Sequence, residues 1–497
     1  MTPLALQSAT ELASRLRRRE LSAVQLLQLQ LDRIARLNPA INAVIALDVE
    51  RAMARAGQAD LALSRGESWG PLHGLPMTVK ESYDLPGLPT TWGFEAQRGN
   101  IAQRPAVAVQ RLMDAGAVVF GKTNVPVALA DWQSFNPLYG TTHNPWDLTR
   151  TPGGSSGGSA AALAAGLTAL ELGSDIGASI RNPAHYCGVY GHKPTWGVVP
   201  IEGHQLPGEE CIDSVDIAVS GPLARSAHDL TLAMDVLTTP LRAFGPLGWQ
   251  PVAWRDAGRP ARRMRGAVVA DDACAEVDAS IRDELLKLAE FLRRSGLQVS
   301  ETARPVDSRE AWSTYVHLLR AATGAQLNDA DYADALAQHD ALKSVARPSA
   351  IGLAEAHEFA AMHWRGVTLS QRDWVHHDQV RAKLRRQWDA FFTEYDLLIC
   401  PVATTTAFPH MHTGRRWERM VRVNGRDQPC TSALFWAGYP GLCGLPATAV
   451  PLATSAEGLP IGAQIIGPVF ADPVCLRFAR WLETEYRSFV APPMALA

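Results

Sequence analysis

Apolar residues recur every three or four positions over the first 60 residues of the chain. The segments 9–21 (ATELASRLRRREL) and 23–38 (AVQLLQLQLDRIARLN) both carry them at the i, i+3, i+4 spacing of one helix face. Ser8 followed by Glu11 has the capping-box pattern of a helix start. We therefore expect residues 1–60 to be helical and to begin with a capped amphipathic helix rather than a secretory signal peptide.

Short β-prone runs alternate with helical segments along the rest of the chain. The pattern predicts strands at 77–80, 116–124, 262–273, 395–409 and, as a pair joined by a turn, at 441–468, with helices at about 105–115, 281–296 and 473–486. Such alternation is typical of an α/β fold. Residues 308–395 are mostly helical and rich in charge, tryptophan and histidine. Because strands resume after them, we expect one domain over 1–497 with a helical insert or cap at about 308–395.

The segment 151–166 (TPGGSSGGSAAALAAG) concentrates glycine and serine ahead of an alanine-rich run. Glycine- and serine-rich stretches are often linkers, but good helix formers follow here directly and Gly166 closes the run. A phosphate-binding loop would need a lysine after the glycines, and Gly158 is followed by Ser159. The segment therefore predicts a turn that leads into a helix N-terminus, where unpaired backbone N–H groups face the loop.

Composition narrows the classes of protein that fit. Of 497 residues, 47% are hydrophobic and 20% are charged, and the formal net charge is −3. This balance suits a globular protein with a sizeable core and gives no indication of a nucleic-acid or membrane partner. Apolar stretches such as 160–172 are too short to span a bilayer. The seven cysteines are scattered without a CxxC pair, so neither a disulfide framework nor a zinc site is predicted. We expect a soluble, cytoplasmic protein.

Serine-based catalysis fits the glycine-rich segment. A Ser-His-Asp triad stays open at this point because its members can lie far apart in sequence, although the fourteen histidines offer no obvious partner. The other arrangement pairs serine with a buried lysine, because burial lowers the pKa of the amine until it accepts a proton near neutral pH. The candidates for this second arrangement are Lys80, Ser155, Ser156 and Ser179.

The long segment 153–195 (GGSSGGSAAALAAGLTALELGSDIGASIRNPAHYCGVYGHKPT) resembles the signature of the amidase signature family. The segments LHGLPMTVKES (72–82), YGTTHNPWDLTRTPGGSSGG (139–158), YDLLICPVA (395–403) and GLPATAVPLATSAEGLPIGAQIIGP (444–468) resemble further parts of it. The resemblance covers roughly the whole chain and is weakest from about 240 to 390. It implies an α/β fold with a large mixed central β-sheet flanked by helices.

The resemblance also implies a catalytic set. Ser179 matches the nucleophile that becomes acylated, Ser155 the intermediate serine held in a cis peptide, and Lys80 the base. The backbone N–H groups of Ile176, Gly177, Ala178 and Ser179 match the oxyanion hole. Ser156, Asp175 and Arg181 match residues that brace the site rather than react. Neither a metal nor an organic cofactor is implied.

Two features near this set are less certain in role or depart from the family. The resemblance places 128–137 beside the acyl pocket, which makes Leu129, Trp132 and Gln133 candidates for substrate binding, although Trp132 can equally be a packing residue. The usual pattern around the nucleophile is DxGGS, but this chain has Ala178 before Ser179. An alanine there keeps the turn only if its φ is negative or if a strained positive φ is tolerated.

The implied activity is hydrolysis of small to medium carboxylic amides, aryl or hydrophobic ones, to acid and amine through an acyl-enzyme. A carbamate or urethane hydrolase is the alternative. An amidotransferase glutaminase subunit fits less well, because that subunit typically reads GLKPTYG where this chain has GHKPTWG at 191–197. A binding protein that has lost catalysis fits least, since Lys80, Ser155 and Ser179 are all present. The expected partner is a small-molecule amide or carbamate, with no nucleic acid or membrane, for a monomer or homodimer.

Overall fold

One large sheet organises the chain. The computed structural model describes residues 2–206, 215–238, 259–325, 327–342 and 356–496. Within them, eleven strands pair in the order β1-β3-β2-β6-β8-β7-β14-β15-β11-β9-β10. These strands are β1 (Val44–Leu47), β2 (Pro76–Lys80), β3 (Val118–Thr123), β6 (Glu171–Asp175), β7 (Tyr190–Lys193), β8 (Val219–Ala224), β9 (Arg265–Val268), β10 (Gln298–Ser300), β11 (Leu397–Pro401), β14 (Ala447–Thr454) and β15 (Pro460–Ile466).

The sheet is mixed, as the sequence predicts. β2 runs parallel to both β3 and β6, whereas β6, β8, β7, β14, β15 and β11 pair antiparallel in turn. β11, β9 and β10 are parallel again. Two small hairpins lie outside the sheet, β4 (Phe135–Asn136) with β5 (Gly140–Thr141) and β12 (Met420–Val423) with β13 (Arg426–Pro429).

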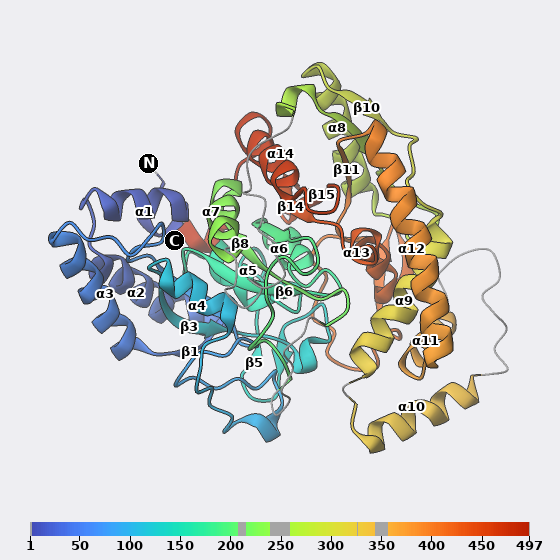
Figure 1. Cartoon of the computed structure of the whole chain (residues 1–497), viewed down its shortest axis with the longest axis horizontal. Helices are drawn as coiled ribbons and strands as arrows, with labels where there is room; N and C mark the ends of the chain where they lie inside the picture. Colours follow the sequence, from blue (N-terminus) through green and yellow to red (C-terminus); the bar gives the residue numbers. More distant parts are fainter. Residues whose placement is uncertain (1, 207–214, 239–258, 326, 343–355, 497) are drawn as a thin grey trace, which may run out of the picture.

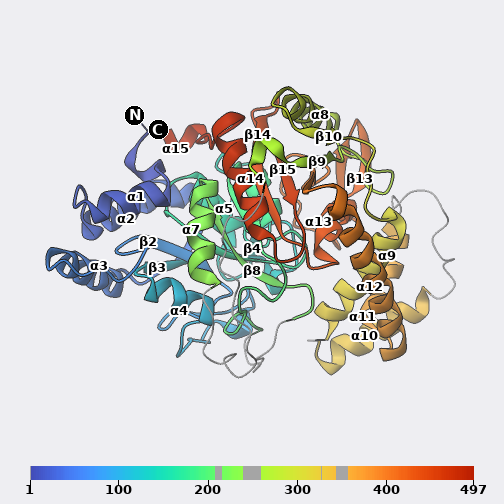
Figure 2. The same cartoon turned by 45° about the horizontal axis from the view of Figure 1, so that its top comes forward.

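Helices surround this sheet (Figure 1). They are α1 (Ala9–Arg17), α2 (Ala23–Ile41), α3 (Val49–Ser64), α4 (Val107–Asp114), α5 (Gly157–Ala164), α6 (Arg181–Cys187), α7 (Ala227–Leu237), α8 (Ala279–Arg294), α9 (Ser308–Gly324), α10 (Asp329–Ala341), α11 (Ala356–Val367), α12 (Gln371–Glu394), α13 (Leu434–Gly441), α14 (Asp472–Glu485) and α15 (Pro493–Leu496). The helices α1–α3 and α9–α12 lie at opposite sides of the molecule (Figures 1 and 2).

The helical segment predicted at 308–395 consists of α9 to α12 in its described part. The strands β9 and β11, which precede and follow it, are neighbours in the same sheet and pair in parallel. The chain therefore leaves the sheet at β9, adds β10 at the edge, forms these helices and returns beside its point of departure.

The N-terminal 60 residues differ from the expectation in one place. Val44–Leu47 forms the edge strand β1, paired antiparallel with β3, instead of continuing the helices. A run of only four residues carries too little periodicity to separate a strand from a helix, so pairing with β3 decides it. The Ser8 cap forms as predicted, with the Glu11 N–H donating to Ser8 Oγ at 3.1 Å.

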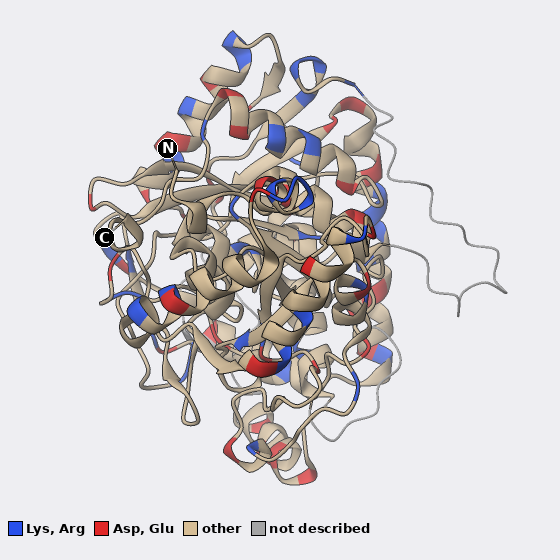
Figure 3. Ribbon diagram, turned by 90° about the vertical axis from the view of Figure 1, so that its left-hand side faces the viewer, with Lys and Arg blue, Asp and Glu red and all other residues tan. Residues whose placement is uncertain are grey.

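Charged residues of both signs are interspersed over the face drawn in Figure 3, in keeping with the small net charge. None of the helices within the described ranges combines the length and the apolar character that crossing a bilayer requires.

Candidate active site

The glycine-rich segment is a buried loop between Thr151 and α5, not a linker. All residues from 151 to 166 are buried. A Cβ at Gly154 would collide with the Asp131 carbonyl oxygen, and one at Gly157 would collide with Ser134 Oγ. The glycines are therefore required because neighbouring segments approach the backbone too closely for any Cβ.

Lys80 is the last residue of β2, in the interior of the sheet. Its side chain is fully buried. Its Nζ is hydrogen-bonded to Ser155 Oγ at 2.6 Å and to Ser174 Oγ at 2.9 Å. The parallel pairing of β2 with β6 explains how residues so distant in sequence meet, because Ser174 lies on β6 and the glycine-rich loop precedes that strand.

Burial decides the protonation of this lysine. Loss of hydration lowers the pKa of Lys80 to about 7, although the carboxylates of Asp175 and Glu81 favour the charged form. An amine with such a pKa is largely neutral at slightly alkaline pH and can accept a proton from a hydroxyl group.

Ser155 and Ser179 belong to two segments that are bonded to each other. The Ser156 N–H donates to the Ser179 carbonyl at 3.1 Å, and Ser156 Oγ donates to the Ser174 carbonyl at 3.4 Å. The Gly154–Ser155 peptide bond is cis. Ser179 is 4% exposed, and its hydroxyl makes no hydrogen bond to any residue that the structure describes. Of the three candidates, it is the one most accessible from outside.

Asp175 and Arg181 brace the turn that carries Ser179. Both side chains are fully buried and form an ion pair of 2.9 Å. The Asp175 carboxylate also accepts the backbone N–H groups of Ala178, Ile180 and Arg181. Burial opposes its ionisation, but the Arg181 guanidinium outweighs this and holds the pKa of Asp175 below its usual value.

The same turn fixes which backbone donors are available. The Ala178 N–H donates to Asp175 Oδ1 at 2.9 Å, so it is engaged and does not serve a ligand in this structure. The N–H groups of Ile176, Gly177 and Ser179 have no hydrogen-bond partner among the described residues. The four-donor oxyanion hole expected from the sequence thus stays a prediction for these three alone. Ala178 itself has a φ of 66°, the left-handed conformation that favours glycine.

The three substrate-binding candidates differ in their surroundings. Trp132 is mostly buried, and its Nε1 donates to the Gly177 carbonyl at 2.7 Å, so this indole holds the turn. Both ends of the Gln133 amide are bonded to the Met411 backbone, at 2.7 and 2.8 Å. Leu129 is partly exposed in a short turn, with a φ of 55°. A role in substrate binding stays a prediction for all three.

Two further residues at the site were not found from the sequence. Ser174 contacts Lys80, and its position directly before Asp175 was the available indication. Tyr315, on α9, donates its hydroxyl to the Ile176 carbonyl at 3.1 Å. Nothing in the sequence indicated this contact, because the two residues are 139 positions apart.

Histidine and cysteine have other surroundings. Within the described ranges, no histidine is hydrogen-bonded to Ser155 or Ser179. Cys187 is fully buried, and burial raises the pKa of its thiol well above the ordinary value, so it is not a nucleophile. The arrangement therefore offers a neutral amine and paired hydroxyl groups, which can move a proton from a serine that attacks a carbonyl carbon.

Comparison with known proteins extends over nearly all of this chain. The model of a family described as Amidase matches residues 25–476. An indoleacetamide hydrolase from Bradyrhizobium diazoefficiens is 31% identical over 96% of this chain and 86% of its own. An acylamidase from Rhodococcus erythropolis is also 31% identical, over 95% and 94% of the two chains.

A different activity occurs among the relatives. A glutamyl-tRNA(Gln) amidotransferase chain from Acidothermus cellulolyticus is 31% identical over 98% of this chain and 96% of its own. Among solved structures, a bacterial aryl acylamidase of the amidase signature family superposes with a TM-score of 0.78 and 22% identity, covering 98% and 97% of the two chains. That structure is similar in fold.

The pKa of Lys80 generates the first prediction. If neutral Lys80 is the base, kcat/KM rises with pH through about 7 and is flat above, because deprotonation of the ammonium creates the active form. Lys80→Ala removes this rise and lowers kcat/KM by roughly 100- to 10,000-fold. The measurement is a pH–rate profile of both proteins on one neutral amide.

Lys193 supplies the matched control. It is also fully buried on the sheet, and burial together with Arg181 lowers its pKa to about 7, but its Nζ donates to the Pro194 carbonyl. Lys193→Met is expected to keep the rise near pH 7. Loss of the rise in Lys193→Met and its survival in Lys80→Ala would contradict the assignment.

The second prediction concerns the positive φ of Ala178. Ala178→Val lowers the free energy of unfolding by about 2 kcal/mol or more, because a β-branched residue is strained at this φ and its site is fully buried. Ala178→Gly changes it by no more than about 1 kcal/mol, since relief of strain offsets a lost methyl group. Chemical denaturation of the three proteins measures this difference, and equal stability of the valine variant would refute it.

Proposed function

The chain belongs to the amidase family and is an amide-cleaving hydrolase, and from this premise we propose that Ser179, Ser155 and Lys80 form its catalytic relay. The observation that carries the proposal is the 2.6 Å contact between Lys80 Nζ and Ser155 Oγ in a site without water-exposed charge. The relatives named as indoleacetamide hydrolase and acylamidase support an amide as the substrate.

The first half of the reaction acylates Ser179. Neutral Lys80 accepts the Ser155 proton while Ser155 accepts the proton of Ser179, and Ser179 Oγ forms a bond to the amide carbonyl carbon. The carbonyl oxygen becomes an oxyanion. The proton on Lys80 then returns through Ser155 to the amide nitrogen, the C–N bond breaks, and the amine leaves.

The second half releases the acid. Water takes the place of the amine and gives its proton to the relay while its oxygen attacks the acyl-enzyme. Collapse of the second tetrahedral intermediate returns the proton to Ser179 Oγ and frees the carboxylic acid. Lys80 is neutral again at the end of the cycle, so no net proton is consumed by the enzyme.

The N–H groups of Ile176, Gly177 and Ser179 are proposed to stabilise both oxyanions. Each such donor typically contributes about 2.7–4 kcal/mol to transition-state binding. Their support comes from the carbonyl groups of the same turn, because Tyr315 holds the Ile176 oxygen and Trp132 the Gly177 oxygen. These bonds orient the peptide planes before substrate binds.

For the substrate we propose small to medium amides with aryl or hydrophobic groups. Aromatic side chains near the site support this, since Trp132 contacts the catalytic turn and tryptophans of 312–436 approach from the helical segment. We further propose that residues 308–395 are a cap inserted into one domain over 1–497, supported by the pairing of β9 with β11. A cytoplasmic location stays a prediction.

The third prediction identifies the acylated residue. A serine-reactive fluorophosphonate is expected to label the purified protein, and mass spectrometry places the adduct on the peptide that contains Ser179. Ser179→Ala abolishes labelling, whereas Ser64→Ala, a change of an exposed serine on α3, leaves it unchanged. An adduct on Ser155, Ser156 or Cys187 would contradict the relay.

The fourth prediction concerns substrate class. The purified chain alone is expected to release ammonia from an arylacetamide such as indole-3-acetamide at least about tenfold faster, as kcat/KM, than from acetamide, because the aromatic group adds apolar contact. An aryl carbamate measured in parallel tests the urethane alternative. Release of ammonia from glutamine and no other amide, and only with a partner chain and an acceptor tRNA present, would indicate the amidotransferase function instead.

A further inference from the structure

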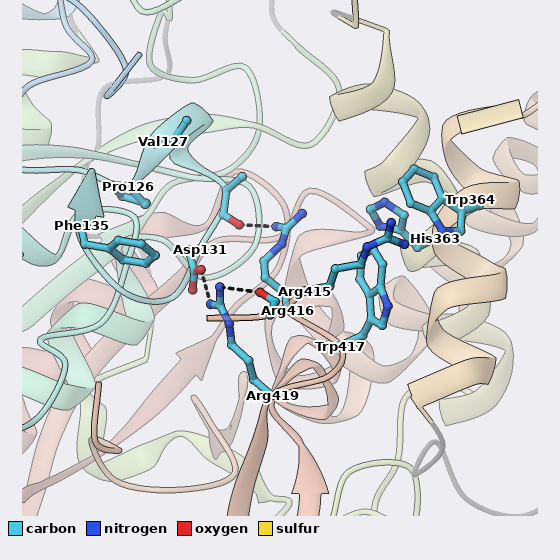
Figure 4. A pocket seen from close by; sticks show the side chains of 12 residues that line it. Pro126, Val127, Asp131, Phe135, His363, Trp364, Arg415, Arg416, Trp417 and Arg419 are labelled. Atoms are coloured by element: carbon cyan, nitrogen blue, oxygen red, sulfur yellow. Dashed lines mark hydrogen bonds and ion pairs between the residues drawn. The ribbon is translucent and has the colours of Figure 1, made fainter. Parts of the chain in front are cut away.

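A cavity of about 410 Å³ lies between the segment before Gln133 and the helical segment around α11 (Figure 4). Among the residues that line it are Ala130, Asp131, His363, Trp364, Arg415 and Trp417. The cavity combines aromatic walls with arginine side chains, a composition that none of the catalytic residues requires.

Positive charge is in excess around this cavity. Arg415, Arg416 and Arg419 line it, and Asp131 is the one carboxylate among the described residues that do so. Asp131 pairs with Arg419, at side-chain exposures of 13% and 10%. Arg416 donates to the Ala130 carbonyl, a neutral group. Glu418 lies nearby and accepts the Arg415 backbone N–H at 2.8 Å.

Arg415 has aromatic neighbours instead of a carboxylate partner. Its guanidinium lies 5.9 Å from the Trp364 ring centre and 5.7 Å from that of Trp417. The two indoles meet edge to face at 5.8 Å. Figure 4 shows Arg415 beside both rings. A guanidinium above aromatic faces keeps its N–H groups directed outward and available.

Arg320 adds a fourth and buried positive group. It comes from α9 and is 6% exposed. Its Nε has no hydrogen-bond partner in the described part of the chain, and its guanidinium lies 5.7 Å from the Phe359 ring centre. Burial and the neighbouring Arg416 lower the pKa of Arg320 to about 9. Burial and these arginines also keep the pKa of His363 well below its usual value, so that this ring is neutral.

A buried arginine without an anion is costly, because guanidinium groups give up hydration that only an acceptor replaces. We propose that the cavity binds a carboxylate carried on a planar aromatic group, and that the substrates of this amidase have such an anionic end away from the bond that is cleaved. The fork of a guanidinium matches a carboxylate, and the indoles of Trp364 and Trp417 suit an aromatic ring. The second part of the proposal rests on the proposed amidase function.

The cavity borders the catalytic loop through one short segment. Ala130 and Asp131 line the cavity, the Asp131 carbonyl packs against Gly154, and Trp132 bonds to the Gly177 carbonyl. A ligand held by the arginines therefore lies next to the backbone that positions Ser155 and Ser179. This placement suits recognition of a substrate rather than a separate regulatory site.

Binding of a stable probe tests the cavity without catalysis. Benzoate and acetophenone have similar shapes, but only benzoate is an anion, and neither contains an amide. Isothermal titration of the full chain at low salt is expected to give at least about tenfold tighter binding of benzoate than of acetophenone. Arg415→Gln, an exposed loop position, and Arg320→Met each remove this preference. Arg422→Gln, on the neighbouring hairpin with a side chain 72% exposed, retains it.

Three results would overturn the proposed cavity ligand. These are equal affinity for the two probes, an unchanged preference in Arg415→Gln, and displacement of benzoate by inorganic phosphate at lower concentration. Kinetics then test the substrate: 4-acetamidobenzoate should have a KM about tenfold lower than neutral 4-methylacetanilide, and Arg415→Gln should remove this difference with little change in kcat. Benzoate binding without hydrolysis of either anilide would contradict the substrate assignment alone, leaving the anion site in place.

Discussion

The burial of one lysine amine is the constraint on which the site depends. Lys80 lies at the end of a central strand with its Nζ enclosed by Ser155 and Ser174. Hydroxyl groups replace only part of the hydration that an ammonium has in water, so the neutral amine is favoured and the pKa falls to about 7. The surrounding loop must exclude water to keep this effect, and the buried glycines of 151–166 allow that close packing.

A second requirement is that Asp175 must not restore the charge of Lys80. This carboxylate is near enough to favour the ammonium, but it already accepts two side-chain bonds from Arg181 and three from backbone N–H groups. Its charge is thus largely compensated. The same bonds shape the turn before Ser179, so a single ion pair sets both the electrostatics of the base and the conformation of the nucleophile's backbone.

The helical segment and the glycine-rich core meet at the same turn. Tyr315 from α9 and Trp132 from the segment after η3 (Val127–Leu129) hold the adjacent carbonyl groups of Ile176 and Gly177. α9 also carries Arg320, on the side of the arginine cavity. Movement of this helix would therefore affect the orientation of the catalytic turn and the shape of the cavity together, which couples recognition of a substrate to the position of the reacting groups.

The sequence by itself determined the family, the mixed α/β sheet and the candidates Lys80, Ser155 and Ser179, because each depends on a long local motif or on periodicity within one element. Only the tertiary structure decided that Val44–Leu47 is a strand, that the Ala178 N–H is engaged by Asp175, and that arginines of 415–419 meet α9 and α11. The strand pairing and the arginine cavity are contacts between segments tens to hundreds of residues apart, and the Asp175 contact depends on the backbone conformation of one turn. Local residue patterns carry no record of such contacts, since packing fixes them after the elements have formed.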